Sequence, residues 1–314
     1  MKKVLLASTA LVASAGIAAA DVSLSGSAEL GIIDDDTATQ FHTDIDVTFT
    51  MSGETDGGLT FGASVDLDES DDGEAFDNTD QGGETLFISG SFGTLTMGDT
   101  DGALDRVLNE AIFGASITDE NEHVGYNGNN GLDGEFYDGQ IARYDYSFGD
   151  LAFAASVEID DGDVGDPVLG LGVSYDVELG GIDLGLGLGY QSVDTGTVEA
   201  DLIGFSVDAS LGGGFSAAAS IMQGDVEGEP DPEHFGIAVG YSVDALSIGV
   251  NYGEFTDWLL NDAEEANASG FGLVVGYDLG GGAEVQFGVA DNDRDEDAGG
   301  EDTTVWSLGI AMSF

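Results

Sequence analysis

The chain has 314 residues, with 62 Asp and Glu against 5 Lys and Arg, which gives a formal net charge of −57 at pH 7. A nucleic-acid partner is excluded, because binding to phosphates requires cationic side chains. Hydrophobic residues make up 42% of the chain, and Phe and Tyr recur along its length, so the acidity does not indicate disorder. The chain has no cysteine, so packing and hydrogen bonds alone must hold the fold.

The first twenty residues have the three parts of a secretory signal peptide. Lys2-Lys3 precedes a run of apolar or small residues at 4–17, and Ala18-Ala19-Ala20 supplies the cleavage pattern. We expect cleavage before Asp21, which leaves residues 21–314 as the folded domain. The alternative is a membrane anchor helix, but the apolar run is shorter than the roughly 20 residues that a span requires.

From residue 21 onward, apolar residues alternate with small, polar or acidic ones. Alternate side chains of a strand point to opposite faces, so this period of two predicts strands. In the first segment, Val22, Leu24 and Leu30 share one face. Sixteen strands are predicted, at residues 22–33, 41–52, 59–68, 84–91, 95–99, 140–148, 151–159, 168–178, 182–190, 201–210, 215–222, 234–244, 246–252, 269–279, 283–290 and 303–314.

The connections between these segments alternate in length. Short glycine-rich turns, such as Gly180-Gly181, alternate with longer acidic stretches, such as 223–232, 253–268 and 291–302. Short turns at one end, long loops at the other and apolar residues on one face are typical of a transmembrane antiparallel β-barrel with a polar lumen. The alternative is a soluble, secreted, acidic β-protein with a structural or Ca²⁺-dependent surface role.

Four local features resemble the Gram-negative general-diffusion porins, particularly those of alphaproteobacteria. They are the expected mature start at 21–26, the hairpin at 90–99, the segment 143–148 and the terminal Phe314, which is preceded by apolar residues spaced by two. The resemblance implies a sixteen-stranded outer-membrane barrel, usually a homotrimer, which passes small hydrophilic solutes. It also implies that Phe314 is a signal read by the barrel assembly machinery, and that the barrel contacts the lipid bilayer and lipopolysaccharide.

In this family the third loop folds into the lumen, and here that loop is residues 99–139, with a short helical piece expected at 103–113. We expect it to narrow the pore, opposite polar residues of the wall. The candidate constriction residues are Asp99, Asp101, Asp105, Glu110, Asp119, Glu120 and Glu122 from the loop, and His42, Asp44, Asp46, Arg143 and Asp145 from the wall. The excess of carboxylates predicts a preference for cations. Porins of this kind often carry arginines on the wall opposite the loop carboxylates, which creates a transverse field. Only Arg143 is expected to join such a cluster here, so a strong transverse field is not expected.

No cofactor is required by these patterns. The acidic loops allow loose binding of Ca²⁺ or Mg²⁺, because hard cations accept carboxylate oxygens. A Ca²⁺ loop at 291–302 lacks the required glycine, since Glu296 stands in its place. A barrel enzyme is the third hypothesis, but no G-x-S-x-G nucleophile turn is present, so we expect no enzymatic activity.

Overall fold

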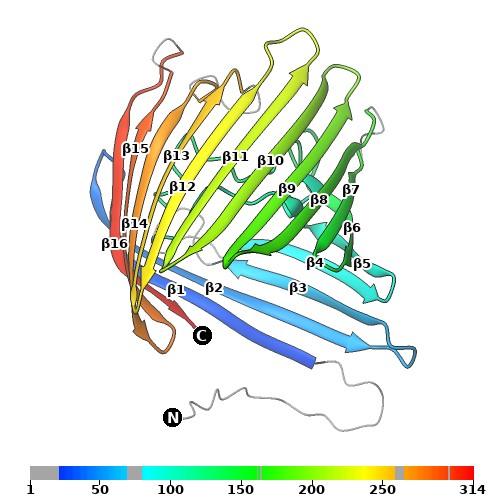
Figure 1. Ribbon diagram of the computed structural model, residues 1–314, viewed down its shortest axis with the longest axis horizontal. Coiled ribbons are helices and arrows are strands. Elements are labelled where there is room, and N and C mark those ends of the chain that lie inside the picture. The colour runs from blue at the N-terminus through cyan, green and yellow to red at the C-terminus, as the bar shows by residue number, and fades with distance from the viewer. Residues whose placement is uncertain (1–20, 69–79, 161, 163–164, 259–264, 296–297) are drawn as a thin grey trace.

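The computed structural model describes residues 21–68, 80–160, 162, 165–258, 265–295 and 298–314. These residues form a closed barrel of sixteen antiparallel strands, in which β1 pairs with β16 (Figure 1). The strands are β1 (Asp21–Asp34), β2 (Thr39–Glu54), β3 (Thr60–Asp68), β4 (Asp80–Gly90), β5 (Gly93–Asp99), β6 (Gln140–Phe148), β7 (Leu151–Glu158), β8 (Val168–Leu179), β9 (Ile182–Asp194), β10 (Glu199–Gly212), β11 (Phe215–Val226), β12 (Glu233–Val243), β13 (Leu246–Thr256), β14 (Ser269–Gly280), β15 (Ala283–Asp293) and β16 (Thr303–Ser313). The predicted signal peptide at 1–20 lies outside the described residues.

Each predicted segment overlaps one strand, so the predicted fold class is confirmed. Several strands are longer than predicted at the end with the long connections. β11, β13 and β15 continue to Val226, Thr256 and Asp293, through residues that we expected in loops. Backbone pairing continues there, as in the register of Asp293 with Ser269, because the ladder does not depend on apolar alternation.

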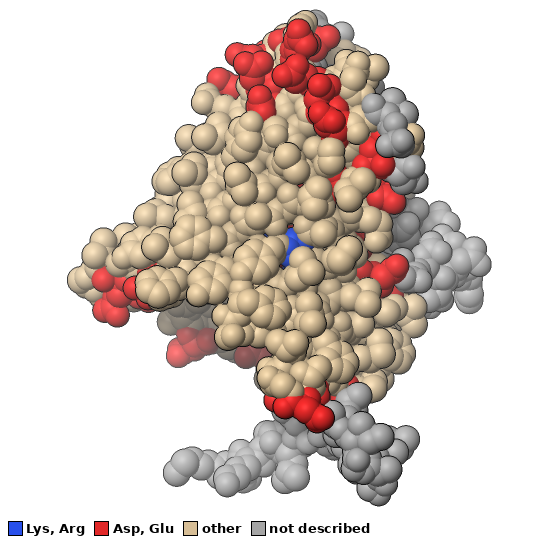
Figure 2. All heavy atoms as spheres, turned by 90° about the vertical axis from the view of Figure 1, so that its right-hand side faces the viewer, with Lys and Arg blue, Asp and Glu red and all other residues tan. Residues whose placement is uncertain are grey.

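Apolar side chains cover the outer face of the barrel. Phe41 is 84% exposed and Leu171 is 61% exposed, although both lie within strands. Figure 2 shows a broad central area without acidic side chains, with the acidic residues gathered towards the edges of this face. An apolar band of this kind is what a bilayer requires of a barrel wall. The opposite side of each strand is called the inner face below.

The barrel is closed by tight turns and by its terminal strand. The Gly180-Gly181 turn has φ angles of +66° and +87°, which glycine adopts without strain and which suit a two-residue hairpin. At the last residue, the backbone N–H of Phe314 donates to the carbonyl oxygen of Gly26 at 2.9 Å. The C-terminal residue therefore takes part in joining the two ends of the sheet.

The described part of the chain has one α-helix, α1 (Ala103–Val107), in the connection between β5 and β6. No described helix is long and apolar enough to cross a membrane. The helix ends six residues before the predicted limit at Phe113. At Asn109 the backbone N–H donates to the hydroxyl of Ser206 in β10, at 2.7 Å, instead of to a helix carbonyl.

Candidate pore constriction

Residues 100–139, called the third loop below, pack against the inner face. Ala103, Leu104 and Val107 of α1 are buried, and the helix contacts β7, β8 and β9. The apolar core lies here, between the loop and the wall, and also includes Leu132 and Leu202. The loop therefore packs against the wall through apolar contacts.

Glycines of the inner face make this close approach possible. A Cβ on Gly172 or on Gly187 would overlap the backbone oxygens of Ala103 and Val107, respectively. Farther along the wall, a Cβ on Gly249 would overlap the carbonyl oxygen of Phe113. The sequence pattern indicates only that these glycines belong to a polar face of small residues. In the structure they lie where the loop packs against the wall.

Hydrogen bonds fix the loop to the wall on both sides of this contact. The backbone N–H of Ala103 donates to the hydroxyl of Ser156 in β7 at 2.8 Å. The backbone N–H of Leu132 donates to Oε1 of Gln191 in β9, also at 2.8 Å. Polar side chains at these inner positions thus serve as partners of the loop backbone.

Glu120 is an anchor of the loop rather than a group open to solvent. Its side chain is buried and accepts hydrogen bonds from the hydroxyls of Ser116 and Thr118 in the loop. The hydroxyl of Ser307 in β16 also donates to Glu120, at 2.6 Å. Three hydroxyl groups donate hydrogen bonds to the buried carboxylate of Glu120. The bond from Ser307 attaches the loop to β16.

Two histidines meet where the loop crosses β12–β14. The backbone N–H of Gly125 donates to Nδ1 of His123 at 3.1 Å, so the proton of this imidazole lies on Nε2. His234 of β12 places Nε2 at 3.1 Å from the carbonyl oxygen of Gly125 and therefore donates to it. Burial lowers the pKa of His123 to about 4, and the nearby His234 adds to the shift. His123 is therefore neutral when the loop is in place.

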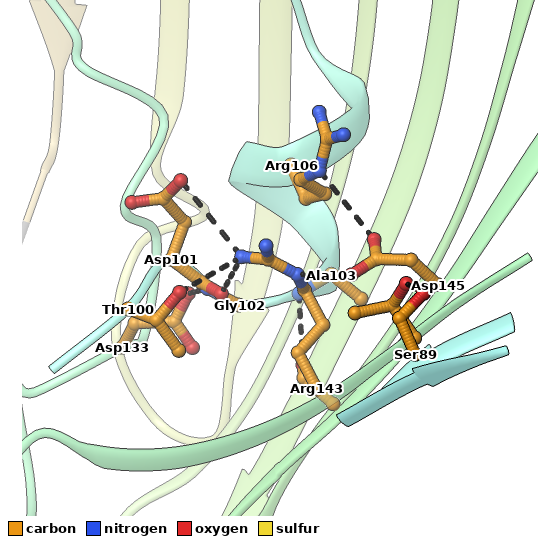
Figure 3. Close-up of polar contacts among 11 residues, drawn as sticks. Ser89, Thr100, Asp101, Gly102, Ala103, Arg106, Asp133, Arg143 and Asp145 are labelled. Atoms are coloured by element: carbon orange, nitrogen blue, oxygen red, sulfur yellow. Dashed lines mark hydrogen bonds and ion pairs between the residues drawn. The ribbon is translucent and has the colours of Figure 1, made fainter. Parts of the chain in front are cut away.

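Two arginines, Arg106 of α1 and Arg143 of β6, form a cluster around Asp145 (Figure 3). Arg143 is buried; its Nε donates to Asp145 at 3.0 Å, and its Nη1 donates to the carbonyl oxygen of Asp101 at 2.5 Å. Nε of Arg106 lies 3.4 Å from the second oxygen of Asp145. Arg143 is the arginine expected on the wall, and α1 brings a second arginine, Arg106 of the loop, to the same carboxylate.

The early strands contribute the acidic part of the wall. His42, Asp44 and Asp46 lie on the inner face of β2, where the hydroxyl of Ser27 donates to Asp46 at 2.9 Å. Nε2 of His42 lies 3.6 Å from Oε2 of Glu29 in β1. Glu29 was not among the predicted site residues, although it shares the inward parity of Ser27 in the same strand.

The loop carboxylates differ in their surroundings. Burial raises the pKa of Asp105 to about 7, and the neighbouring carboxylates of Asp101 and Glu110 add to the shift. Glu110 accepts a hydrogen bond from the hydroxyl of Tyr126. Asp119 and Glu122 are exposed and border a cavity of about 680 Å³. These groups face water-filled space.

Asp99 does not lie with the other candidate constriction residues. It is the last residue of β5 and shares the parity of Leu95 and Met97, whose side chains point to the outer face. It lies opposite Gln140 in the ladder, whereas Thr96 pairs with Arg143 of the arginine cluster.

Comparison with known proteins identifies the family. A family model described as Gram-negative porin matches residues 7–311. The porin of Rhodobacter capsulatus is 32% identical over 298 residues, which cover 87% of this chain and 95% of that protein. A porin structure refined at 1.8 Å resolution has a TM-score of 0.72 at 25% identity, covering 94% of this chain and 100% of the other.

A second solved structure has the same fold at lower identity. The anion-selective porin from Comamonas acidovorans has a TM-score of 0.66 at 16% identity, covering 94% of this chain and 100% of that one. The comparisons do not favour the soluble β-protein or the barrel enzyme. The chain belongs to the Gram-negative porin family, and it is an outer-membrane diffusion channel rather than an enzyme.

Proposed function

We propose that this porin passes small hydrophilic solutes and ions with a preference for cations. The observation that carries the proposal is the position of Glu29. It interacts electrostatically with Asp44 and Asp46 of the wall and with Asp119 and Glu120 of the third loop. Carboxylates therefore stand on both sides of the space between the loop and β1–β2, and such a lining attracts cations and repels anions.

The basic residues do not offset this lining. Among the described residues, Arg143 is paired with Asp145 and Asp101, Arg106 with Asp145, and Arg294 with Glu265. The relative from Comamonas is described as anion-selective although it has the same fold. Selectivity in this fold must therefore depend on the charges of the lumen, and here these are mostly carboxylates.

Reversal potentials across a KCl gradient test the proposal. We expect a preference for potassium at neutral pH and low salt. The preference should weaken as salt rises, because the Debye length falls from about 8 Å at physiological salt to about 3 Å at 1 M. A preference for chloride in dilute solution would refute the acidic lumen and leave the barrel intact.

We also propose that the third loop narrows the lumen. Its contacts with the inner face from β7 to β16 support this role. Deletion of residues 110–125 removes the Glu120 and His123 attachments and should raise the single-channel conductance. An unchanged conductance in a folded deletion variant would contradict the proposal.

The cofactors and partners stay predictions. Among the described residues, no group of three or more His, Cys, Asp or Glu is arranged to hold a metal ion. Loose binding of Ca²⁺ or Mg²⁺ at the acidic loops stays a prediction. A homotrimer should migrate on gels as a heat-sensitive oligomer. Contacts with lipopolysaccharide and recognition of Phe314 by the assembly machinery are testable by extraction and by assembly assays.

A further inference from the structure

A second cavity, of about 510 Å³, lies on the inner face of β4–β6. Its lining includes Arg106, Arg143 and Asp145 together with the hydroxyls of Ser89, Thr94 and Thr96. Two of the chain's three arginines therefore line one cavity. The rest of the polar lumen is dominated by carboxylates, so this cavity is chemically distinct from its surroundings.

The two arginines are engaged to different degrees. Arg143 is 9% exposed at its side chain, and it bonds Asp145, Thr100 and Asp101. Arg106 is 54% exposed at its side chain, and within the described residues its one ion pair is from Nε to Asp145. In Figure 3 the terminal nitrogens of Arg106 point away from Asp145. Its guanidinium thus keeps an unused pair of donors at the cavity.

Such a pair of donors matches the two oxygens of a carboxylate. A guanidinium binds a carboxylate through two parallel hydrogen bonds, which a single ammonium cannot do. The hydroxyls of Ser89 and Thr94 are 2.8 Å apart, so one of them keeps a proton for another acceptor. Thr96 adds a further hydroxyl to the same lining. The cavity therefore offers neutral donors beside the guanidinium.

The charges around the cavity determine which carboxylate-containing solutes can bind there. Asp105 is adjacent to Arg106 in α1, and Asp101 is 61% exposed at its side chain. A simple anion would be repelled by these groups and by the acidic lumen that it must cross. A solute with a carboxylate and an ammonium group would place the first on Arg106 and the second near Asp101 and Asp105.

We propose that the cavity at Arg106 binds the carboxylate of small zwitterionic solutes and favours their passage over that of anions and neutral solutes of similar size. The inference rests on the proposed function, because the cation-selective lumen is what excludes simple anions. The site is not a closed pocket, so binding is weak and is detected as a difference in rates.

Swelling of proteoliposomes measures these rates, with glycine betaine as the zwitterion and erythritol as the neutral reference. The ratio of the betaine rate to the erythritol rate should fall about fivefold in Arg106→Gln, which corresponds to about 1 kcal/mol for one exposed charge-assisted contact. Arg106→Lys keeps the charge without the paired donors and should give an intermediate ratio. Arg294→Gln removes the same charge beside Glu265, outside this cavity, and should leave the ratio unchanged.

A second variant tests whether the fall in the betaine ratio in Arg106→Gln results from displacement of the loop. Thr96→Val removes one hydroxyl from the lining without touching α1 and should lower the betaine ratio to a smaller extent. An unchanged ratio in both Arg106→Gln and Thr96→Val would overturn the proposal, and so would an equal fall in Arg294→Gln. Reversal potentials in KCl distinguish a failure of the proposed cation selectivity from a failure of the proposed zwitterion site. Preference for chloride would refute the cation-selective lumen, whereas preference for potassium with a betaine ratio insensitive to Arg106 would refute only the zwitterion site.

Discussion

Protonation of His123 should loosen the middle of the third loop. The imidazole is 4% exposed, and its pKa is lowered from 6.5 to about 4 because burial disfavours the charged form. A released loop would expose His123 to water and restore the ordinary pKa. The attachment is therefore at full strength above pH 6.5 and weakens progressively as the pH falls towards 4.

The size of the effect follows from the two pKa values. At pH 4.5 an exposed histidine is almost fully protonated, whereas His123 in the attached loop is mostly neutral. Linkage then gives a loss of about 2.5 kcal/mol in the free energy of attachment between pH 7.5 and 4.5, or about 70-fold in the equilibrium constant. Asp105 and Asp133 have raised pKa values and act in the opposite direction, so the His123 contribution must be taken from a variant.

Amide hydrogen exchange measures this attachment. The backbone N–H groups of Val124, Gly125 and Tyr126 bond to Asn292, to Nδ1 of His123 and to the carbonyl oxygen of His123. After correction for intrinsic exchange rates, their protection in the wild-type protein should fall between pH 7.5 and 4.5 by about 70-fold more than in His123→Asn.

The asparagine variant keeps an acceptor near the Nδ1 position and does not titrate. His42→Asn serves as a control, because His42 lies on β2 and pairs with Glu29 instead of with the loop. Equal pH dependence in the wild-type protein and in His123→Asn would refute the reasoning.

Three further predictions concern selectivity, packing and assembly. Asp105→Asn should flatten the rise of cation preference between pH 6 and 8, because the pKa of Asp105 is about 7 and its charge appears in this range; reversal potentials at each pH measure it. Gly253→Ala should displace the loop at a cost of about 1–3 kcal/mol, because the new Cβ would overlap the carbonyl oxygen of Gly125; lower amide protection at Val124 and noisier single-channel currents are expected. Phe314→Asp should lower the yield of the heat-modifiable form on gels, because it places a charge at a site that is 80% exposed on the outer surface, whereas Phe314→Tyr should keep that yield.

The wall of the channel was predictable from the sequence because a strand has a strict parity. Alternation places Asp44 and Asp46 on the inner face, and in the structure both are less exposed than Thr43 and Ile45 beside them. The same rule adds Glu29 on β1 and excludes Asp99 on β5, which shares the parity of Met97. The inner position of Glu29 and the outer position of Asp99 are therefore both predictable from the sequence.

The third loop was less predictable because its partners are set by the closed barrel. Glu120 bonds Ser307, which lies 187 residues away, and no local period relates them. Arg106 was missed because the short helix α1 directs it to Asp145, which belongs to the strand that follows the loop. Acidic residues of one loop therefore looked alike in sequence, although one anchors the loop and others face the cavity.

The inner-face glycines nevertheless contain information about the path of the loop. From β8 to β14 the inner positions include Gly172, Gly187, Gly249 and Gly253, where a Cβ would overlap the loop backbone. On β1–β3 most inner positions instead carry hydroxyls and carboxylates, such as Ser27, Asp46 and Asp66, which bond one another or neighbouring hydroxyls. Gly31 is an exception, because a Cβ there would overlap Ile117 of the loop. Glycine on the inner face removes the side chain that would fill the lumen, so a second chain segment can pack there. Where an inward position carries a polar side chain instead of glycine, that part of the wall faces the water of the lumen. In this barrel, the distribution of glycine among inward positions therefore indicates which side of the wall receives most of the loop and which side lines the pathway for solutes.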